Sequence, residues 1–181
     1  MKELKEFTIP FVGLKLGEHH FDFKIDASFF EHFEYDEFND VNIGLDVLLN
    51  KKTTLLEFDL SFSGEVDVLC DLTSEPFHQD VSGNYHFVVK FGEEYNDENE
   101  DLLILPHGSY EVNIQQYIYE SIVLALPSRF IHPGIEDGTL KSDILEKLEE
   151  LRPKQLEENQ EEKDTKTDPR WDDLKKLLTD K

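Results

Sequence analysis

Apolar and polar residues alternate along the chain from residue 56 to residue 72. A period of two places successive side chains on opposite faces of a β-strand. One face collects the apolar residues Leu56, Phe58, Leu60, Phe62, Val66, Val68, Cys70 and Leu72. The other face carries the carboxylates Glu57, Asp59, Glu65 and Asp67. The pattern predicts an antiparallel sheet with one buried face and one acidic face in water, with a bend or bulge at Gly64.

Four further stretches carry the same signal, and they extend the predicted sheet. They are residues 8–16, 19–25, 41–49 and 85–91, with a short strand or edge expected at 102–105. Residues 17–18 are expected to turn the chain, and the turn before residue 85 is predicted at 82–84 or near 75–76. After residue 25, Asp26 or Ser28 can cap a short helix with phenylalanines on one side.

The strongest amphipathic helix is predicted at residues 113–126, where Pro127 ends it. Asn113 can act as the N-cap, and Gln116 three residues later completes a capping box. Apolar residues recur at intervals of three and four along this helix. A helix with so wide an apolar stripe is expected to be mostly buried against the sheet. Glu120 is its one acid, and a surface-facing carboxylate is favoured over a functional one.

The C-terminal region is predicted to divide into a linker and a terminal helix. Residues 1–152 are predicted to form an α+β domain, in which an antiparallel twisted sheet or partial β-barrel is packed by the central helix 113–126. This domain would end with a helix that starts at Ser142 or Asp143. Residues 153–167 have too few apolar side chains to pack, which predicts a flexible charged linker. Residues 168–181 are predicted to be helical, docking either on their own domain or in the groove of a partner. The residues expected to bind a partner there are Asp168, Pro169, Arg170, Trp171, Leu174 and Leu177.

The net charge of −23 is concentrated in the predicted domain. Residues 1–148 carry 30 acidic and 10 basic side chains, whereas residues 149–181 carry 11 and 8. A surface of this charge repels phosphate and anionic lipid, so nonspecific nucleic-acid binding and membrane contact are disfavoured. A basic protein is the natural complement, although such charge can also serve solubility alone. The acidic strand face with Glu57, Asp59, Glu65 and Asp67 is the expected contact surface.

Motifs of known enzyme chemistry are missing from the sequence. It contains no glycine-rich phosphate loop, no G-x-S-x-G and no H-E-x-x-H. Cys70 is the only cysteine, which excludes an internal disulfide and a zinc site of clustered cysteines. The acidic stretch 93–101 lacks EF-hand spacing and is expected to be a mobile loop. We therefore predict no catalytic residue, metal or cofactor, and expect a cytoplasmic protein because no signal peptide or membrane span is recognisable.

Three motifs, in this order, resemble the YceD family of large ribosomal RNA subunit accumulation proteins. The strand 64–72, with Cys70 near its end, is similar to a family strand that ends in a cysteine. The helix end formed by Glu120, Leu124, Leu126 and Pro127 looks like the family's E-x-x-x-L-x-L-P. The closing D-P-R-W at 168–171, with its two following leucines, is similar to the family's final helix. Cys70 and these four helix residues are expected to have structural roles.

The sequence also departs from the family pattern at two places. Residues 71–73 contain no arginine after the cysteine, and residues 128–133 lack the cysteines that could hold zinc. No metal site is therefore carried over.

The resemblance implies a role in large-subunit ribosomal RNA accumulation without an established catalytic activity. Together with the charge, it predicts an acidic domain that holds a basic ribosomal protein or assembly factor. Ribosomal RNA would be contacted indirectly or through the C-terminal tail. The alternatives are an acidic chaperone or adaptor unrelated to ribosomes, and an enzyme that uses acidic residues near the central helix.

Overall fold

The computed structural model describes residues 4–140 and 142–151, apart from the side chain of Glu136. The chain divides into two compact units, Met1–Glu146 and Lys147–Lys181. The predicted linker 153–167 and terminal helix 168–181 lie outside the described residues. Among the described residues 4–140 and 142–151, no helix is long and apolar enough to span a membrane.

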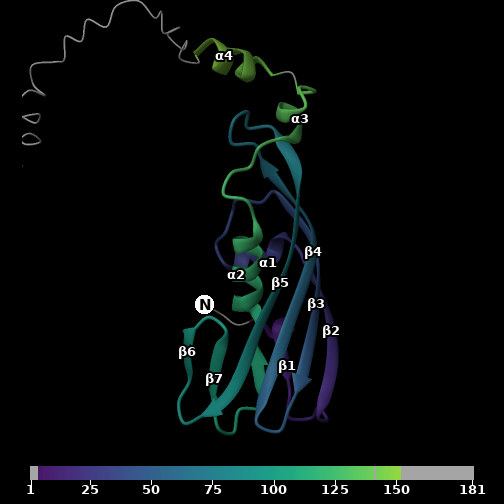
Figure 1. Cartoon of the computed structure of the whole chain (residues 1–181), viewed down its shortest axis with the longest axis vertical. Coiled ribbons are helices and arrows are strands. Elements are labelled where there is room, and N and C mark those ends of the chain that lie inside the picture. The colour runs from purple at the N-terminus through teal and green to yellow at the C-terminus, as the bar shows by residue number, and fades with distance from the viewer. Residues whose placement is uncertain (1–3, 141, 152–181) are drawn as a thin grey trace, which may run out of the picture. The chain divides into compact units, whose positions relative to one another are not determined.

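The first unit combines strands and helices, which confirms the predicted α+β class (Figure 1). The strands are β1 (Thr8–Pro10), β2 (Gly17–Ile25), β3 (Asp40–Lys51), β4 (Leu55–Leu69), β5 (Pro76–Gly92), β6 (Asn96–Asn99), β7 (Leu102–Pro106) and β8 (Glu111–Asn113). The helices are the 3-10 turn η1 (Lys5–Phe7), α1 (Ala27–His32), α2 (Gln115–Ala125), α3 (Pro133–Glu136) and α4 (Asp143–Leu151), the last of which crosses the boundary between the units.

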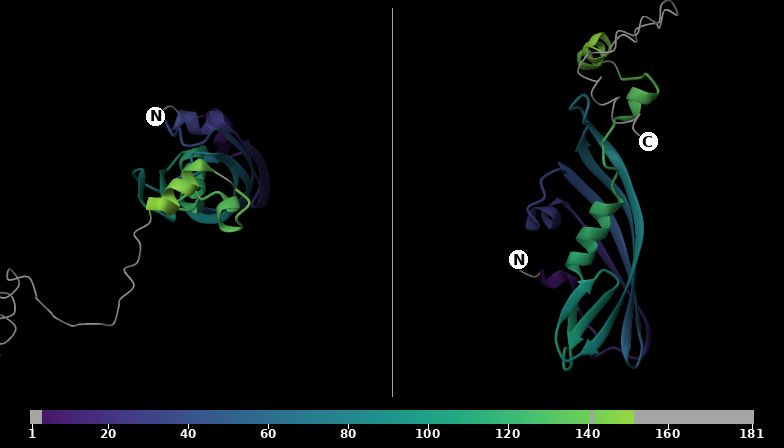
Figure 2. Two further views of the ribbon diagram at one scale, coloured as in Figure 1. Left: turned by 90° about the horizontal axis from the view of Figure 1, so that it is seen from above. Right: turned by 60° about the vertical axis from the view of Figure 1, so that its left-hand side comes forward.

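Six strands form one sheet in the order β2-β3-β4-β5-β7-β6, and β1 pairs separately with β8. All neighbours in the large sheet are antiparallel except β5 and β7, which run parallel. The sheet curves around α2 as a partial barrel, yet its edge strands β2 and β6 do not pair with each other (Figure 2). The sheet was predicted to be antiparallel, and it is so except for the parallel pair of β5 and β7.

Helix α2 lies against β5 and is held there by buried isoleucines. Ile114, Ile118 and Ile122 are all fully buried. On another side of the same helix, Tyr119 stacks on Phe33, which follows α1, with 4.2 Å between the ring centroids. These contacts attach the helix to the concave face of the sheet and to α1, so its position is set by apolar burial.

The start of α2 differs from the predicted capping box. The N-cap position is taken by Ile114 and not by the predicted Asn113, although Asn113 Oδ1 accepts a hydrogen bond from the first helical residue, Gln115 N, at 3.0 Å. Gln116, however, donates to Glu120 Oε1 at 2.6 Å and does not reach back to Asn113. The buried Gln115 instead accepts a hydrogen bond from Leu4 N at 2.6 Å, which ties the N-terminal segment to the helix.

Several predicted strand and turn boundaries need correction. An alternating pattern does not specify which strand lies alongside, and pairing decides where a strand begins and ends. The stretch 8–16 is a strand only over Thr8–Pro10, and the predicted turn at 17–18 belongs to β2. Of the two turns considered before residue 85, that near 75–76 is right, since 82–84 lie inside β5. The acidic stretch 93–101 is only partly loop, because Asn96–Asn99 pairs with β7.

Gly64 occupies a regular ladder position and not a bulge. It lies opposite Ile43 on one side and Val81 on the other without a shift of register. A Cβ atom at this position would lie 2.2 Å from the carbonyl oxygen of Asn42. Glycine is therefore required by the close approach of the neighbouring strand, which is the other usual reason for glycine within a sheet.

Candidate functional site

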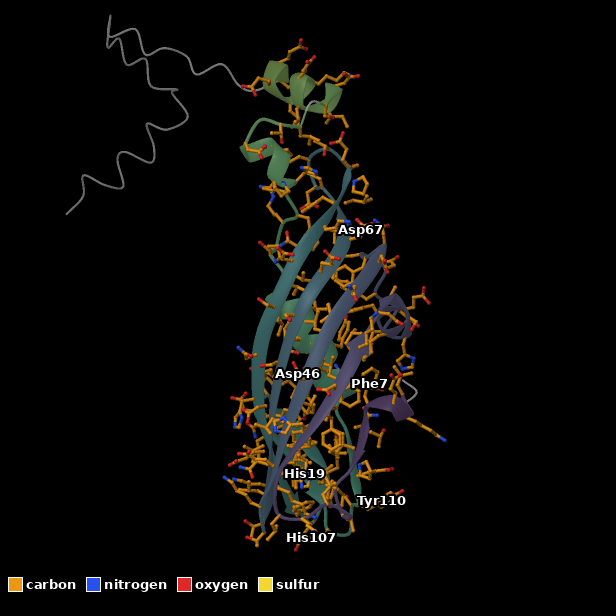
Figure 3. All side chains as sticks on the ribbon, turned by 90° about the vertical axis from the view of Figure 1, so that its right-hand side faces the viewer. Phe7, His19, Asp46, Asp67, His107 and Tyr110 are labelled. Atoms are coloured by element: carbon orange, nitrogen blue, oxygen red, sulfur yellow. The ribbon has the colours of Figure 1, made fainter. Side chains whose placement is uncertain are left out.

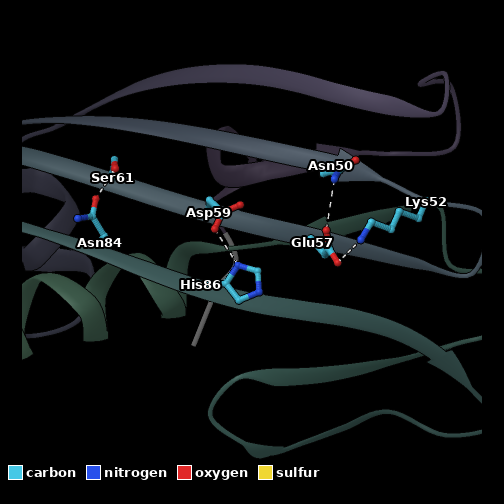
Figure 4. A network of polar contacts seen from close by, with 7 residues as sticks. All are labelled: Asn50, Lys52, Glu57, Asp59, Ser61, Asn84 and His86. Carbon is cyan, nitrogen blue, oxygen red and sulfur yellow. Dashed lines mark hydrogen bonds and ion pairs between the residues drawn. The ribbon is translucent and has the colours of Figure 1, made fainter.

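The outer face of the large sheet carries the four predicted contact acids on β4. Asp59 is exposed, and its Oδ1 lies 2.7 Å from His86 Nδ1 on β5 (Figure 4). Glu57 is half-buried, accepts a hydrogen bond from Asn50 and pairs with Lys52. Two of the four carboxylates thus already have partners that bear, or can bear, positive charge.

The remaining two, Glu65 and Asp67, lie further along the same strand. Glu65 is exposed and faces Asp80 across the strand pair, and the half-buried Asp67 faces Asp40. Asp46 and Asp67 are labelled along the sheet in Figure 3. The Asp22 carboxyl, opposite Asp46 in the ladder, hydrogen-bonds to it and raises the pKa of Asp46. Like charges therefore meet at this pair of strands.

A second acidic surface lies where α2 meets the lower part of the sheet. A groove of about 970 Å³ opens between α2, β5, the β6–β7 hairpin and the segment leading into β8. Carboxylates and tyrosines dominate its polar lining: Asp97, Glu98, Glu100, Glu111, Glu120, Tyr85, Tyr95, Tyr110 and Tyr117. Among the described residues that line it there is no lysine, arginine or histidine. We call this the α2 groove.

Stacked rings connect the α2 groove to the core. Phe58 and Phe87 stack with 4.9 Å between centroids, and Phe87 stacks on Tyr117 at 4.1 Å. Tyr117 in turn stacks on Tyr85 at 6.1 Å. Because Phe58 and Phe87 are fully buried, this series gives the groove a rigid aromatic wall.

The electrostatic potential in the α2 groove is negative. Burial, together with Tyr95, Tyr85 and the carboxylates Asp97 and Glu120, raises the pKa of Tyr117 above its ordinary value. Burial and nearby carboxylates, Glu120 among them, raise the pKa of Tyr85 in the same way. Burial is the larger cause of both shifts and disfavours either sign of charge, whereas the neighbouring carboxylates add a negative potential that favours a cation over an anion.

The family-motif residues Glu120 and Leu124 lie on the exposed side of α2, and Leu126 and Pro127 follow its end. Glu120 is exposed, as favoured from the sequence, and both Glu120 and Leu124 line the α2 groove. Leu124 is 83% exposed, Leu126 is partly buried against the core, and Pro127 is exposed. The rest of α2 packs as expected from the sequence, because Ile118 and Ile122 are buried and Tyr117, Tyr119 and Val123 are partly buried against the same core.

Cys70 is a buried residue directly after β4. Its Sγ accepts a hydrogen bond from His132 N at 3.4 Å, and Asp71 N donates to the carbonyl of Phe130. These contacts join the end of β4 to the segment that follows α2. Over the described residues, no group of three or more metal-ligating side chains comes together.

The groove tyrosines and Glu98, Glu100 and Glu111 were not among the predicted contact residues. They come from β5, β6, β8, α2 and the segments that connect these elements, and β5 and α2 are far apart in sequence. One signal was present, since Tyr95 and Tyr110 are large side chains within polar stretches, and they prove to be 57% and 62% exposed. Their convergence depends on the pairing of β7 with β5.

Comparison with known proteins identifies one family. Residues 58–178 match the family described as large ribosomal RNA subunit accumulation protein YceD. The match covers two thirds of the chain and includes β4 from Phe58 onward, Cys70 and α2, with the motifs recognised in the sequence. No match was found among the curated proteins or among the solved structures. The chain therefore belongs to the YceD family.

Proposed function

We propose that this protein supports the accumulation of large-subunit ribosomal RNA as a non-enzymatic assembly factor in the cytoplasm. The observation that carries this proposal is its membership of the YceD family, whose description names that process. The family motifs on β4 and α2 lie in the part of the chain that the match covers. A general acidic chaperone would share the charge but would have no reason to carry these motifs.

The proposed mode of action is the binding of a basic protein by the acidic unit. Residues 1–148 carry 30 acidic and 10 basic side chains, so phosphate groups are repelled from most of this surface. Ribosomal proteins and many factors bound to ribosomal RNA are basic, and opposite potentials accelerate their encounter with an acidic surface. Ribosomal RNA would then be affected through the protein that is held.

The segment 168–177 is proposed as a second contact. Its Asp168, Pro169, Arg170, Trp171, Leu174 and Leu177 lie outside the described residues and remain a prediction. If this segment binds a partner, Trp171→Ala should leave the melting temperature unchanged and weaken recovery of the partner from lysate. A large loss of thermal stability would instead mean that the segment supports its own domain.

Ribosome profiles of a strain that lacks the protein test the proposed process. We expect a deficit of large subunits on sucrose gradients, restored by the wild-type gene. A normal profile with normal large-subunit ribosomal RNA would contradict the proposal and favour an adaptor unrelated to ribosomes.

The proposed partner class is tested by affinity capture of the full chain from lysate. A basic protein should be retained at low salt, released at moderate salt and still captured after ribonuclease treatment. Tight binding of purified ribosomal RNA without any protein would contradict the proposed partner.

A further inference from the structure

The α2 groove combines size, exposed aromatic rings and negative charge. It has a volume of about 970 Å³, which is at the upper end of ordinary ligand sites. Exposed tyrosine rings, Tyr95 and Tyr110, stand beside an aromatic wall that includes Tyr117. Carboxylates from α2, β6 and β8 line the groove, and none of its described lining residues is basic.

This combination favours a guanidinium group over other cations. A guanidinium stacks flat on an aromatic ring and forms paired hydrogen bonds with a carboxylate. The lysine ammonium shares the charge but neither the planar stacking nor the forked geometry. A bound metal ion is a poorer fit, because no group of three or more ligating side chains comes together in the described part of the chain. An anion is repelled by the carboxylates that line the groove.

The outer sheet face is the competing surface, and it is less suited to such a ligand. Its Glu57 pairs with Lys52 and its Asp59 with His86, so a guest cation would have to displace these groups. Its strands also present a curved, continuous surface with few aromatic side chains. The α2 groove offers cations a concave site whose described lining has no basic competitor.

We propose that the α2 groove binds an arginine-rich extended segment of the basic partner, with arginine side chains between the tyrosines and the carboxylates. This assignment rests on the proposed function for the nature of the partner. It replaces the outer sheet face as the principal contact and gives the exposed side of α2, including Glu120 and Leu124, a role in recognition.

The test is a binding titration of the full chain with a fluorescein-labelled peptide of alternating arginine and glycine. Fluorescence anisotropy should report saturable binding that weakens with salt. The same peptide with lysine in place of arginine should bind more weakly, because only the charge is kept. Equal affinity for both peptides would overturn the arginine assignment.

Two matched variants with the same change in charge locate the site. The groove variant carries Glu98→Gln, Glu100→Gln, Glu111→Gln and Glu120→Gln, and the outer-face variant carries Glu57→Gln, Asp59→Asn, Glu65→Gln and Asp67→Asn. All four groove positions are exposed, so folding should persist, as circular dichroism can verify. We expect the groove variant to lose about tenfold in affinity and the outer-face variant less than about threefold. Equal losses would overturn the proposal.

A substitution that leaves the charge unchanged separates the groove from general electrostatics. Tyr110→Ala should weaken the arginine peptide by about threefold to tenfold, whereas Tyr110→Phe should retain most of the affinity. An unchanged affinity of Tyr110→Ala would overturn the stacking role. A shift of Trp171 fluorescence in Tyr110→Ala without peptide would mean that the chain's own C-terminal segment occupies the groove, and would overturn the proposal as well.

Complementation separates this inference from the proposed function. If the deletion strain loses large subunits and the groove variant restores them fully, the proposed function stands and the groove assignment fails. If the arginine peptide binds the groove but the deletion strain has normal ribosomes, the groove stands as a site and the proposed function fails.

Discussion

The packing of α2 against the sheet can be tested by replacing one of its buried isoleucines. Ile118 is fully buried in the middle of the helix, whereas Leu124 on the same helix is 83% exposed. Replacing a buried isoleucine by alanine costs about 2–5 kcal/mol, because apolar contacts are lost and a cavity remains. The better helix propensity of alanine returns only about 0.5 kcal/mol. We therefore expect Ile118→Ala to lower the free energy of unfolding by about 3 kcal/mol.

Thermal unfolding followed by far-ultraviolet circular dichroism measures this loss. For a chain of this size, each kcal/mol corresponds to about 2–4 °C, so the melting temperature should fall by about 10 °C. Leu124→Ala is the matched control, and its effect should stay within about 0.5 kcal/mol because the side chain contacts mainly water. A fall below about 3 °C for Ile118→Ala, or an equal fall for Leu124→Ala, would refute the placement of α2.

Two further predictions concern the sheet and α1. Gly64→Ala should destabilise the protein by about 1–3 kcal/mol, because the new Cβ would lie 2.2 Å from the Asn42 carbonyl oxygen. Gly44→Ala should destabilise the protein less, because the nearest atom to its new Cβ would lie at 3.7 Å. Urea denaturation measures both losses, and equal losses of unfolding free energy would contradict this explanation. Asp26 caps α1, and the hydrogen bond from the Ser28 hydroxyl lowers the Asp26 pKa. Its stabilisation, about 1 kcal/mol, should be complete above the unfolded pKa and disappear as pH falls through the lower folded pKa. The stability difference between wild type and Asp26→Ala should thus shrink in acid, and a difference that stays constant down to pH ~2 would contradict this.

Much of the sheet could be predicted from local pattern. The alternation along β4 assigned Phe58, Leu60 and Val66 to the core and Asp59 and Glu65 to water, as the structure has them. The pattern is informative because the two faces of a half-buried strand meet different solvents at every second residue. The same pattern says nothing about which strand lies alongside. The parallel pairing of β7 with β5 was therefore not predicted.

The candidate groove could not be read from the sequence for the same reason. Its tyrosines are dispersed from residue 85 to residue 117, and each in isolation resembles an ordinary surface aromatic. The acidic stretch 93–101 can be recognised in the sequence, but it lines the groove only because β6 pairs with β7. The exposure of Glu120 and Leu124 depends on how α2 packs, because Ile118 and Ile122 turn toward the core and leave Leu124 in water.

By itself, the sequence determined the inner and outer faces of the strands, the capping of α1, the end of α2 before Pro127, the charge and the family motifs. Each of these depends on residues close together in the chain, where backbone geometry and side-chain chemistry act directly. Only the tertiary structure decided that Gly64 accommodates a neighbouring strand and that Tyr85, Tyr110 and Tyr117 converge with carboxylates around one groove. These contacts join residues that are distant in sequence. They form because one arrangement of the strands buries the shared core better than the alternative arrangements, and no local sequence pattern contains this difference in free energy.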